Sequence, residues 1–258
     1  MKGRALFQFP NLDEEDKLKS QGYELIAGID EVGRGALAGP VVASAVILPH
    51  PASLPWLGLV RDSKELNSRK RESLFDLINK EAVAVGIGIV PSQVIDSVNI
   101  LKATKLAMVQ AVGKLPKQPN FLLIDRVTLS QCPIPQRGIT RGDKLCLSIA
   151  CASIIAKVTR DRMMGEFDQT YPGYGFAQHK GYGTGRHISC LRKLGPSPIH
   201  RLYFAPVRNI ITSQSSGPLA SAHPEPFASC HSEGAERPKN LIQGKLREGS
   251  GDEPPRSW

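Results

Sequence analysis

Two short apolar runs near the start of the chain constrain its fold most. Residues 23–30 (YELIAGID) and 40–48 (PVVASAVIL) are rich in β-branched and small residues, and the glycine-containing turn Gly33-Arg34-Gly35 lies between them. Runs of this length, bounded by Gly and Pro, are typical of strands. Because so few residues separate them, the two strands are expected to pair as an antiparallel hairpin.

Strands and helices alternate after this hairpin. Further strands are expected at 82–90 and 120–125, where short apolar runs recur. Between and after them, helical spacing or an apolar run predicts helices at 67–80, from residue 91, and at 100–115, 144–166 and 185–195. The segment between 126 and 143 is expected to be a Pro-rich loop. This alternation predicts an α/β layered domain with a mixed sheet.

The composition of the chain changes near its end. Ser, Pro, Gly and Ala dominate from about residue 212, so we expect one folded domain over 1–209 and a disordered low-complexity tail over 210–258. No stretch approaches the roughly 18 apolar residues of a membrane span, and the start resembles no signal sequence. The five cysteines show no zinc spacing. These features predict a cytoplasmic protein outside the membrane.

The chain is basic, with 33 Lys and Arg against 24 Asp and Glu and a net charge of +9. Five of the basic and six of the acidic residues follow position 209, so the whole excess lies in the expected domain. A basic surface favours a polyanion such as a nucleic acid, although charge alone decides neither the partner nor the fold.

Four acidic residues stand at the ends of expected elements, where α/β proteins place their sites. Asp30 and Glu31 follow the first strand, Asp125 ends the fourth, and Asp143 precedes the helix at 144–166. A strand-end acid pair is often only exposed surface, and Asp143 suits a helix N-cap equally well. If the four converge, their oxygens suit hard divalent cations, and a pair of such ions can catalyse phosphodiester hydrolysis.

The segment at 28–42 (GIDEVGRGALAGPVV) resembles the opening signature of the ribonuclease HII family. Further matches follow in family order at 62–66 (DSKEL), 123–125 (LID), 152–161 (ASIIAKVTRD), 179–184 (HKGYGT) and 195–201 (GPSPIHR). The resemblance covers roughly residues 22–207. Six motifs in order are far more specific than any one of them.

The resemblance implies a ribonuclease-H-like α/β fold: a mixed five-stranded sheet flanked by helices, with a helical C-terminal subregion. It implies an endonuclease that cuts the RNA strand of RNA/DNA hybrids and cuts 5′ of single ribonucleotides in duplex DNA, which removes them from DNA. The products would carry 3′-hydroxyl and 5′-phosphate ends. Two divalent ions, Mn²⁺ or Mg²⁺, are the expected cofactors. RNA/DNA hybrids and ribonucleotide-containing duplexes are the expected partners of a monomeric enzyme.

The family pattern also assigns a role to each acid, as a catalytic and metal-binding residue. Asp30 would bridge the two ions, and Asp143 would complete the ion site of the attacking nucleophile. Glu31 and Asp125 would complete the ion site of the leaving group.

Six further residues are implied to bind substrate: Gly33, Arg34, Gly35, Lys64, Lys157 and Tyr182. The turn at 33–35 falls where the family reads the ribose 2′-OH, and Tyr182 falls on the tyrosine that stacks on the sugar at the RNA–DNA junction. The two lysines are expected to contact phosphates. Without the family match, a packed loop tyrosine and solvated surface lysines would be the ordinary interpretation.

One position departs from the family pattern. The family usually has a small residue, often Gly, after the strand-end aspartate, and here Arg126 follows Asp125. Its guanidinium could contact a phosphate, point away, or weaken the second metal site. Two alternatives remain: another metal nuclease of this fold, such as a junction resolvase, and, if Arg126 spoils a metal site, a protein that binds hybrids without cutting them. His179, His187 and His200 show no metal-ligand spacing, so packing or phosphate-side roles are expected.

Overall fold

The computed structural model describes residues 9–49 and 54–215. Its centre is a sheet of β1 (Ile26–Val32), β2 (Val41–Ile47), β3 (Ala84–Val90), β4 (Phe121–Asp125) and β5 (Gln136–Ile139), in the order β3-β2-β1-β4-β5. β2 pairs antiparallel with β1 and β3, whereas β4 lies parallel to β1 and to β5. The predicted hairpin and mixed sheet are confirmed.

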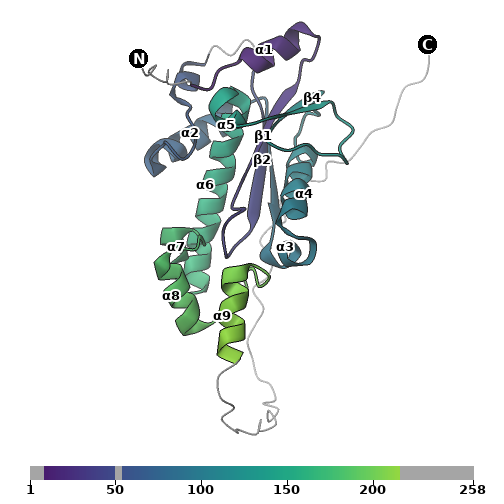
Figure 1. Cartoon of the computed structure of the whole chain (residues 1–258). Helices are drawn as coiled ribbons and strands as arrows, with labels where there is room; N and C mark the ends of the chain where they lie inside the picture. Colours follow the sequence, from purple (N-terminus) through teal and green to yellow (C-terminus); the bar gives the residue numbers. More distant parts are fainter. Residues whose placement is uncertain (1–8, 50–53, 216–258) are drawn as a thin grey trace, which may run out of the picture. The chain divides into compact units, whose positions relative to one another are not determined.

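Helices cover both faces of this sheet. In chain order they are α1 (Asp13–Ser20), the 3₁₀ helix η1 (Pro55–Leu59), α2 (Ser68–Glu81), α3 (Ser92–Val98), α4 (Ile100–Gly113), α5 (Gly142–Leu145), α6 (Leu147–Thr170), α7 (Phe176–His179), α8 (Gly185–Leu194) and α9 (Ala205–Ser215). Figure 1 shows α6 and α4 on opposite sides of the strands. None of the helices in the described ranges is long and apolar enough to span a membrane.

Each face of the sheet contributes to its own core. Ala27 and Ile29 of β1 are buried against α4, whereas Val46 of β2 is buried with α2 and α6. Strands covered on both faces are apolar on both faces, which explains the continuous apolar runs. A Cβ at Gly28 would lie 2.2 Å from the carbonyl carbon of Ser148, so α6 meets β1 backbone to backbone.

Two local features differ from the prediction. β5 lies within the segment expected to be a loop, because none of its four residues is buried, only Ile139 is a large apolar residue, and the strand gives no apolar alternation. The single helix expected at 144–166 is divided into α5 and α6 at Cys146, whose backbone is extended. Asn11 pairs with Cys146 in a parallel bridge, so a tertiary contact interrupts the helix at a point where no Gly or Pro stands in the sequence.

The C-terminal helices form the predicted helical subregion. Phe176 of α7 packs with Met164 of α6, and Leu191 of α8 packs with Val207 and Ile210 of α9. The expected domain end at residue 209 is wrong, because α9 continues to Ser215 and buries Ile210. The rest of the expected tail, 216–258, lies outside the described residues.

His179, His187 and His200 are buried against one another inside this subregion. His187 stacks on His179 with ring centroids 4.2 Å apart, and its Nε2 lies 3.0 Å from Nε2 of His200. The backbone carbonyl of Tyr182 accepts from His187 Nδ1 at 2.9 Å, whereas the Ser197 N–H donates to His200 Nδ1 at 2.9 Å. His187 must therefore be the Nδ1–H tautomer, and His200, which donates to it, the Nε2–H tautomer.

We predict that both rings stay neutral through the physiological pH range in these two tautomers. Burial lowers the pKa of His187 to about 4, and burial together with the nearby His187 lowers the pKa of His200 to about 4. Long-range ¹H–¹⁵N correlation spectra should show one Nδ1–H ring and one Nε2–H ring that do not titrate between pH 5 and 8. A midpoint near 6.5 for either ring would contradict the hydrogen-bond chain.

Candidate active site

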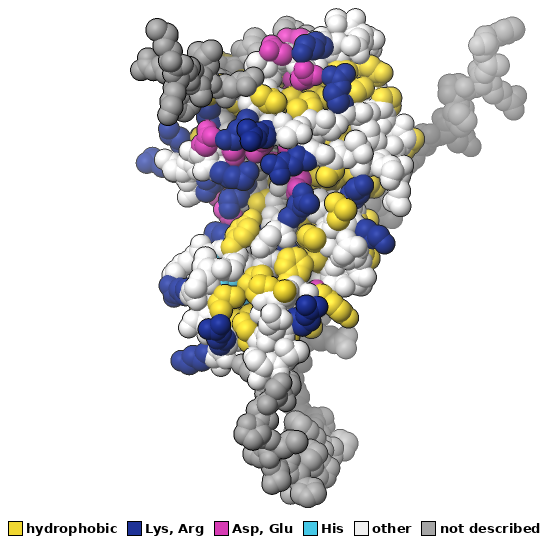
Figure 2. All heavy atoms as spheres, in the orientation of Figure 1, with side chains coloured by type: hydrophobic (Ala, Val, Ile, Leu, Met, Phe, Trp, Pro, Cys, Tyr) yellow, Lys and Arg dark blue, Asp and Glu magenta, His cyan; other side chains and the backbone are white. Residues whose placement is uncertain are grey.

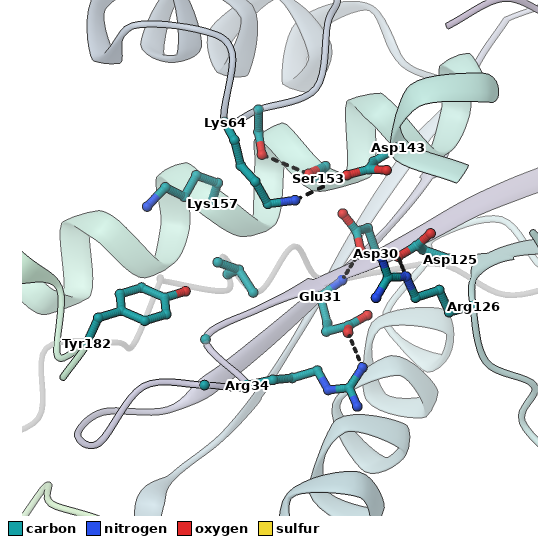
Figure 3. A pocket seen from close by; sticks show the side chains of 14 residues that line it. Asp30, Glu31, Arg34, Lys64, Asp125, Arg126, Asp143, Ser153, Lys157 and Tyr182 are labelled. Carbon is teal, nitrogen blue, oxygen red and sulfur yellow. Dashed lines mark hydrogen bonds and ion pairs between the residues drawn. The ribbon is translucent and has the colours of Figure 1, made fainter. Parts of the chain in front are cut away.

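A cleft of about 670 Å³ opens where β1 and β4 end. It is lined by every residue that the sequence analysis assigned to the site: Asp30, Glu31, Gly33, Arg34, Gly35, Lys64, Asp125, Asp143, Lys157 and Tyr182. Figure 3 shows the acids at one end of the cleft and Tyr182 at the other, with its hydroxyl directed toward them. Residues from six separate segments of the chain are thus brought together.

The sheet register explains how the first three acids meet. The β1–β4 ladder ends at the pair Ile29–Ile124, and the next residue on each parallel strand is an aspartate, Asp30 on β1 and Asp125 on β4. Beyond the ladder this edge of β1 has no neighbouring strand, so Glu31 also reaches the cleft although it follows Asp30 directly. The end of a shared ladder therefore places three carboxylates at one edge.

A backbone contact brings the fourth acid to the same place. The Gly142 N–H donates to Asp125 Oδ1 at 2.8 Å, which holds the first turn of α5 over the end of β4. Asp143 is not an N-cap: Arg141 holds that position, and no side chain caps α5. Instead, Asp143 Oδ2 accepts from Lys64 Nζ at 3.2 Å.

Negative charge is concentrated in a poorly solvated place. Burial raises the pKa of Asp30 well above its ordinary value, and the charges of Glu31 and Asp125 raise it further. Burial also raises the pKa of Glu31 despite its contact with Arg34. Burial raises that of Asp125 as well, although the N–H of Gly142 offsets part of the effect. Burial and mutual repulsion therefore both oppose ionisation of these carboxylates.

The donor set fits a hard divalent cation in kind. It consists of carboxylate oxygens, and Oε2 of Glu31 is buried with no hydrogen-bond partner in the described part of the chain. As the side chains lie, no three His, Cys, Asp or Glu residues among 9–49 and 54–215 are grouped closely enough to hold an ion. Lys64 lies 3.2 Å from Asp143, and Arg34 lies 3.0 Å from Glu31. A bound ion must compete with these two contacts.

Basic side chains border the cleft, and Figure 2 shows Lys and Arg grouped around acidic side chains in the upper half of this face. The Lys64 side chain is 76% exposed and lies 3.7 Å from Asp62 as well as beside Asp143. Burial would lower the pKa of Lys64, but these carboxylates outweigh it and raise that pKa. Lys157 pairs with Asp161 at 2.8 Å, one helical turn away.

Two serines of the cleft were not singled out from the sequence. The Ser153 hydroxyl of α6 acts to lower the pKa of Asp30 against the effect of burial, and its Oγ lies 2.9 Å from the Oγ of Ser63. Both serines lie inside motifs that resemble the family. Their positions were therefore visible, whereas their contact with Asp30 depends on how α6 packs on β1.

The turn at 33–35 and the loop that carries Tyr182 are joined to each other. The Leu37 N–H donates to the Gly181 carbonyl at 2.8 Å, and Ala36 pairs with Tyr182 in an antiparallel bridge. The two expected substrate-reading elements therefore form one small unit at the end of the cleft away from Asp125 (Figure 3).

Comparison with known proteins identifies the family of the chain. The family model described as Ribonuclease HII matches residues 27–207. The chain belongs to the ribonuclease HII family. A curated Ribonuclease HII of Dehalococcoides mccartyi is 54% identical over 202 residues, which cover 78% of this chain and 95% of that protein. As a member of the family, the chain is a metal-dependent endoribonuclease with ribonuclease H activity.

Solved structures agree with the fold. The ribonuclease H2 of Pyrococcus horikoshii OT3 superposes with a TM-score of 0.63 at 25% identity, covering 75% of this chain and all of that one. A structure described as Bst-RNase HIII in complex with Mn²⁺ gives a TM-score of 0.55 at 21% identity, covering 73% of this chain and 70% of that one. The ribonuclease-H-like architecture is therefore confirmed.

The departure from the family pattern at Arg126 has a backbone explanation. Arg126 has φ +60°. This is the left-handed region, which Gly adopts without steric cost and in which other residues are strained. Its Nε lies 3.7 Å from Asp125 Oδ2, and its side chain is 61% exposed. A small residue suits this position because of its backbone conformation, and the guanidinium lies at the cleft margin.

We predict that Arg126→Gly leaves the free energy of unfolding equal to that of the parent protein or raises it. Arg126→Val should lower it. Gly relieves a left-handed strain of about 1–2 kcal/mol, offset in part by its extra freedom in the unfolded chain. A β-branched side chain adds strain in that region. Urea denaturation of Arg126→Gly, Arg126→Val and the parent protein measures the order. Equal stability of Val and Gly would show that the left-handed backbone is not maintained.

We also predict that Asp30→Asn stabilises the metal-free protein. The raised pKa means that the folded protein binds this proton more readily than the unfolded chain. Ionised Asp30 therefore destabilises the fold, and the full cost is present above the raised pKa. Removing the charge should raise the melting temperature in EDTA at pH 8 by about 2 °C or more, since each kcal/mol shifts it by about 2–4 °C in a domain of this size.

The matched control for this measurement is Asp76→Asn, on the exposed face of α2. It should change the free energy of unfolding by less than about 0.5 kcal/mol. A lower melting temperature for Asp30→Asn would mean that the hydrogen bonds of Asp30 outweigh its electrostatic cost.

Proposed function

We propose that this enzyme cuts the RNA strand of RNA/DNA hybrids and cuts on the 5′ side of single ribonucleotides in duplex DNA, with two divalent ions, Mg²⁺ or Mn²⁺. One observation carries the proposal: the four acids, the turn at 33–35 and Tyr182 line the same cleft. The unpartnered oxygen of Glu31 supports the cation requirement. The Mn²⁺ held by the solved RNase HIII relative supports the kind of ion.

Each acid has a proposed place around the ions. Asp30, which has no ion-pair partner among the described residues and lies between Glu31 and Asp125, would bridge the two ions. Asp143 would complete the nucleophile side, and Glu31 with Asp125 the leaving-group side. When bound, the ions would neutralise charge on the attacking and leaving oxygens. Ser153, whose hydroxyl acts to lower the pKa of Asp30, would hold the bridging carboxylate in orientation.

The other end of the cleft would select the substrate. The backbone of the turn at 33–35 would contact the 2′-OH, the group that separates RNA from DNA. Tyr182 would pack on the next sugar when that sugar lacks a 2′-hydroxyl. Lys64 and Lys157 lie between these ends and would contact phosphates. Such a site would remove misincorporated ribonucleotides, leaving a 3′-hydroxyl and a 5′-phosphate.

We predict that the wild-type protein cuts a DNA duplex with one ribonucleotide in Mg²⁺ or Mn²⁺ and does not cut it in EDTA. Asp30→Asn should lower turnover on this duplex and on a continuous hybrid by about 100-fold or more, since charge neutralisation by metal ions contributes several kcal/mol. Tyr182→Ala should lose much more activity on the single-ribonucleotide duplex than on the hybrid. Gel analysis of end-labelled strands measures both the rates and the cleavage position.

An all-DNA duplex and a four-way junction serve as control substrates. Cleavage of the junction in preference to the ribonucleotide duplex would favour a resolvase. Equal loss on both RNA-containing substrates for Tyr182→Ala would remove the proposed junction role from that residue.

A further inference from the structure

Two arginines lie behind the turn, away from the cleft. Arg160 and Arg201 are fully buried, and in the described ranges each donates only to backbone carbonyls and forms no ion pair. Burying an unpaired guanidinium is costly. Burial and the charge of Arg160 lower the pKa of Arg201 to about 9, which leaves it protonated at neutral pH. The free-energy cost of burying these two guanidinium groups indicates that they hold specific parts of the backbone in place.

Arg201 donates hydrogen bonds to the turn itself. Its Nη2 donates to the Gly33 carbonyl at 2.7 Å, and its Nη1 donates to the Arg34 carbonyl at 2.9 Å. Nε and Nη2 also donate to the Gly39 carbonyl, at 3.1 and 2.9 Å. The fork-shaped guanidinium thus fixes two successive carbonyls of the turn on the buried side.

The carbonyl positions determine where the amides point. A peptide unit is planar and trans, so its C=O and N–H point in opposite directions. The Gly33 carbonyl shares a peptide with the Arg34 N–H, and the Arg34 carbonyl shares one with the Gly35 N–H. Both N–H groups therefore point away from Arg201, and the residues that carry them line the cleft. Neither N–H donates to a protein group within 9–49 or 54–215.

The turn would not keep this orientation unaided. The Ala36 N–H donates to the Gly33 carbonyl at 3.3 Å, which makes residues 33–36 a β-turn with Gly35 at its third position. Gly35 has negative φ here, but glycine also tolerates the positive φ of a type II turn. The 34–35 peptide can therefore flip and turn its N–H from the cleft unless its carbonyl is held.

We propose that Arg201 is a positioning residue for sugar selection: it holds the Arg34 and Gly35 amides toward the cleft, where they donate to the 2′-oxygen of the ribonucleotide. The inference rests on the proposed function and adds to it the side chain that orients the turn at 33–35. Lysine cannot replace it, because a single ammonium cannot span the carbonyls of Gly33, Arg34 and Gly39.

The test compares Arg201→Lys with Arg160→Lys, each in the Asp30→Asn background so that substrate is not consumed. Arg160 is a control of equal burial, since it donates to the carbonyls of Ala38, Pro40 and Lys180, none of them within 33–35. Its guanidinium also lies 5.5 Å from the centre of the Tyr182 ring, so Tyr182→Ala is measured beside it to identify any loss that arises through that ring. Fluorescence anisotropy in Mg²⁺ measures Kd for a duplex with one ribonucleotide and for the same duplex in all-DNA form.

We expect Arg201→Lys to reduce the preference for the ribonucleotide duplex by about 10-fold, the worth of two hydrogen bonds, with all-DNA affinity unchanged. Arg160→Lys should retain the preference. A preference retained in Arg201→Lys, or lost equally in both variants, would overturn the proposal. If the Asp30→Asn parent shows no preference and the wild type cuts no ribonucleotide duplex, the proposed function itself fails.

A measurement on the Asp30→Asn parent covers the case in which Arg201→Lys does not fold. The Arg34 and Gly35 amide resonances should shift on addition of the ribonucleotide duplex far more than on addition of the DNA duplex, and the Arg201 guanidinium protons should exchange slowly. Equal shifts with both duplexes, or rapid exchange of those protons, would exclude the anchored orientation.

Discussion

The close approach of α6 to β1 governs the geometry of the site. With only hydrogen on Gly28, the helix lies against the strand backbone, and its position is set by contact between two rigid elements. Ser153, Lys157 and Arg160 then fall on one helical face, at spacings of four and three. Ser153 meets Asp30, Lys157 lines the cleft, and Arg160 lies behind the turn. About 10 Å of helix thus separates the end that holds the acids from the end proposed to read the sugar.

The two ends of the cleft are built on different physical principles. At the acid end, carboxylates are held together against their mutual repulsion by the sheet register and by the Gly142 N–H on Asp125. At the turn end, buried positive charge is spread over backbone carbonyls by Arg160 and Arg201. The first end attracts cations, and the second presents backbone donors in a fixed direction. A rigid support for both is what a selective phosphodiesterase requires.

The sequence predicted those parts of the fold that local patterns determine. The apolar runs of β1, β2 and β4 are mostly buried, and those of β3 alternate between buried and partly buried residues, so these strands were recognisable, whereas β5 at the edge was not. The break at Cys146 depends on pairing with Asn11, far away in the chain. Convergence of Asp30, Asp125 and Asp143 could not be derived from their spacing and was expected only from the family resemblance. The roles of Ser153 and Arg201 depend on side-chain contacts across the domain, which no local pattern reveals.

The bond between Arg201 and the turn also has a consequence for biosynthesis. The turn leaves the ribosome 168 residues before its anchor, which at about 5–20 residues per second corresponds to roughly 10–30 s of translation. All four carboxylates have emerged well before the anchor does, since Asp143 precedes Arg201 by 58 residues. A nascent or prematurely terminated chain would thus contain the hydrolytic groups without the restraint that distinguishes ribose from deoxyribose. On the proposed function, the restraint on the turn is therefore completed only after the last of the four carboxylates has been made.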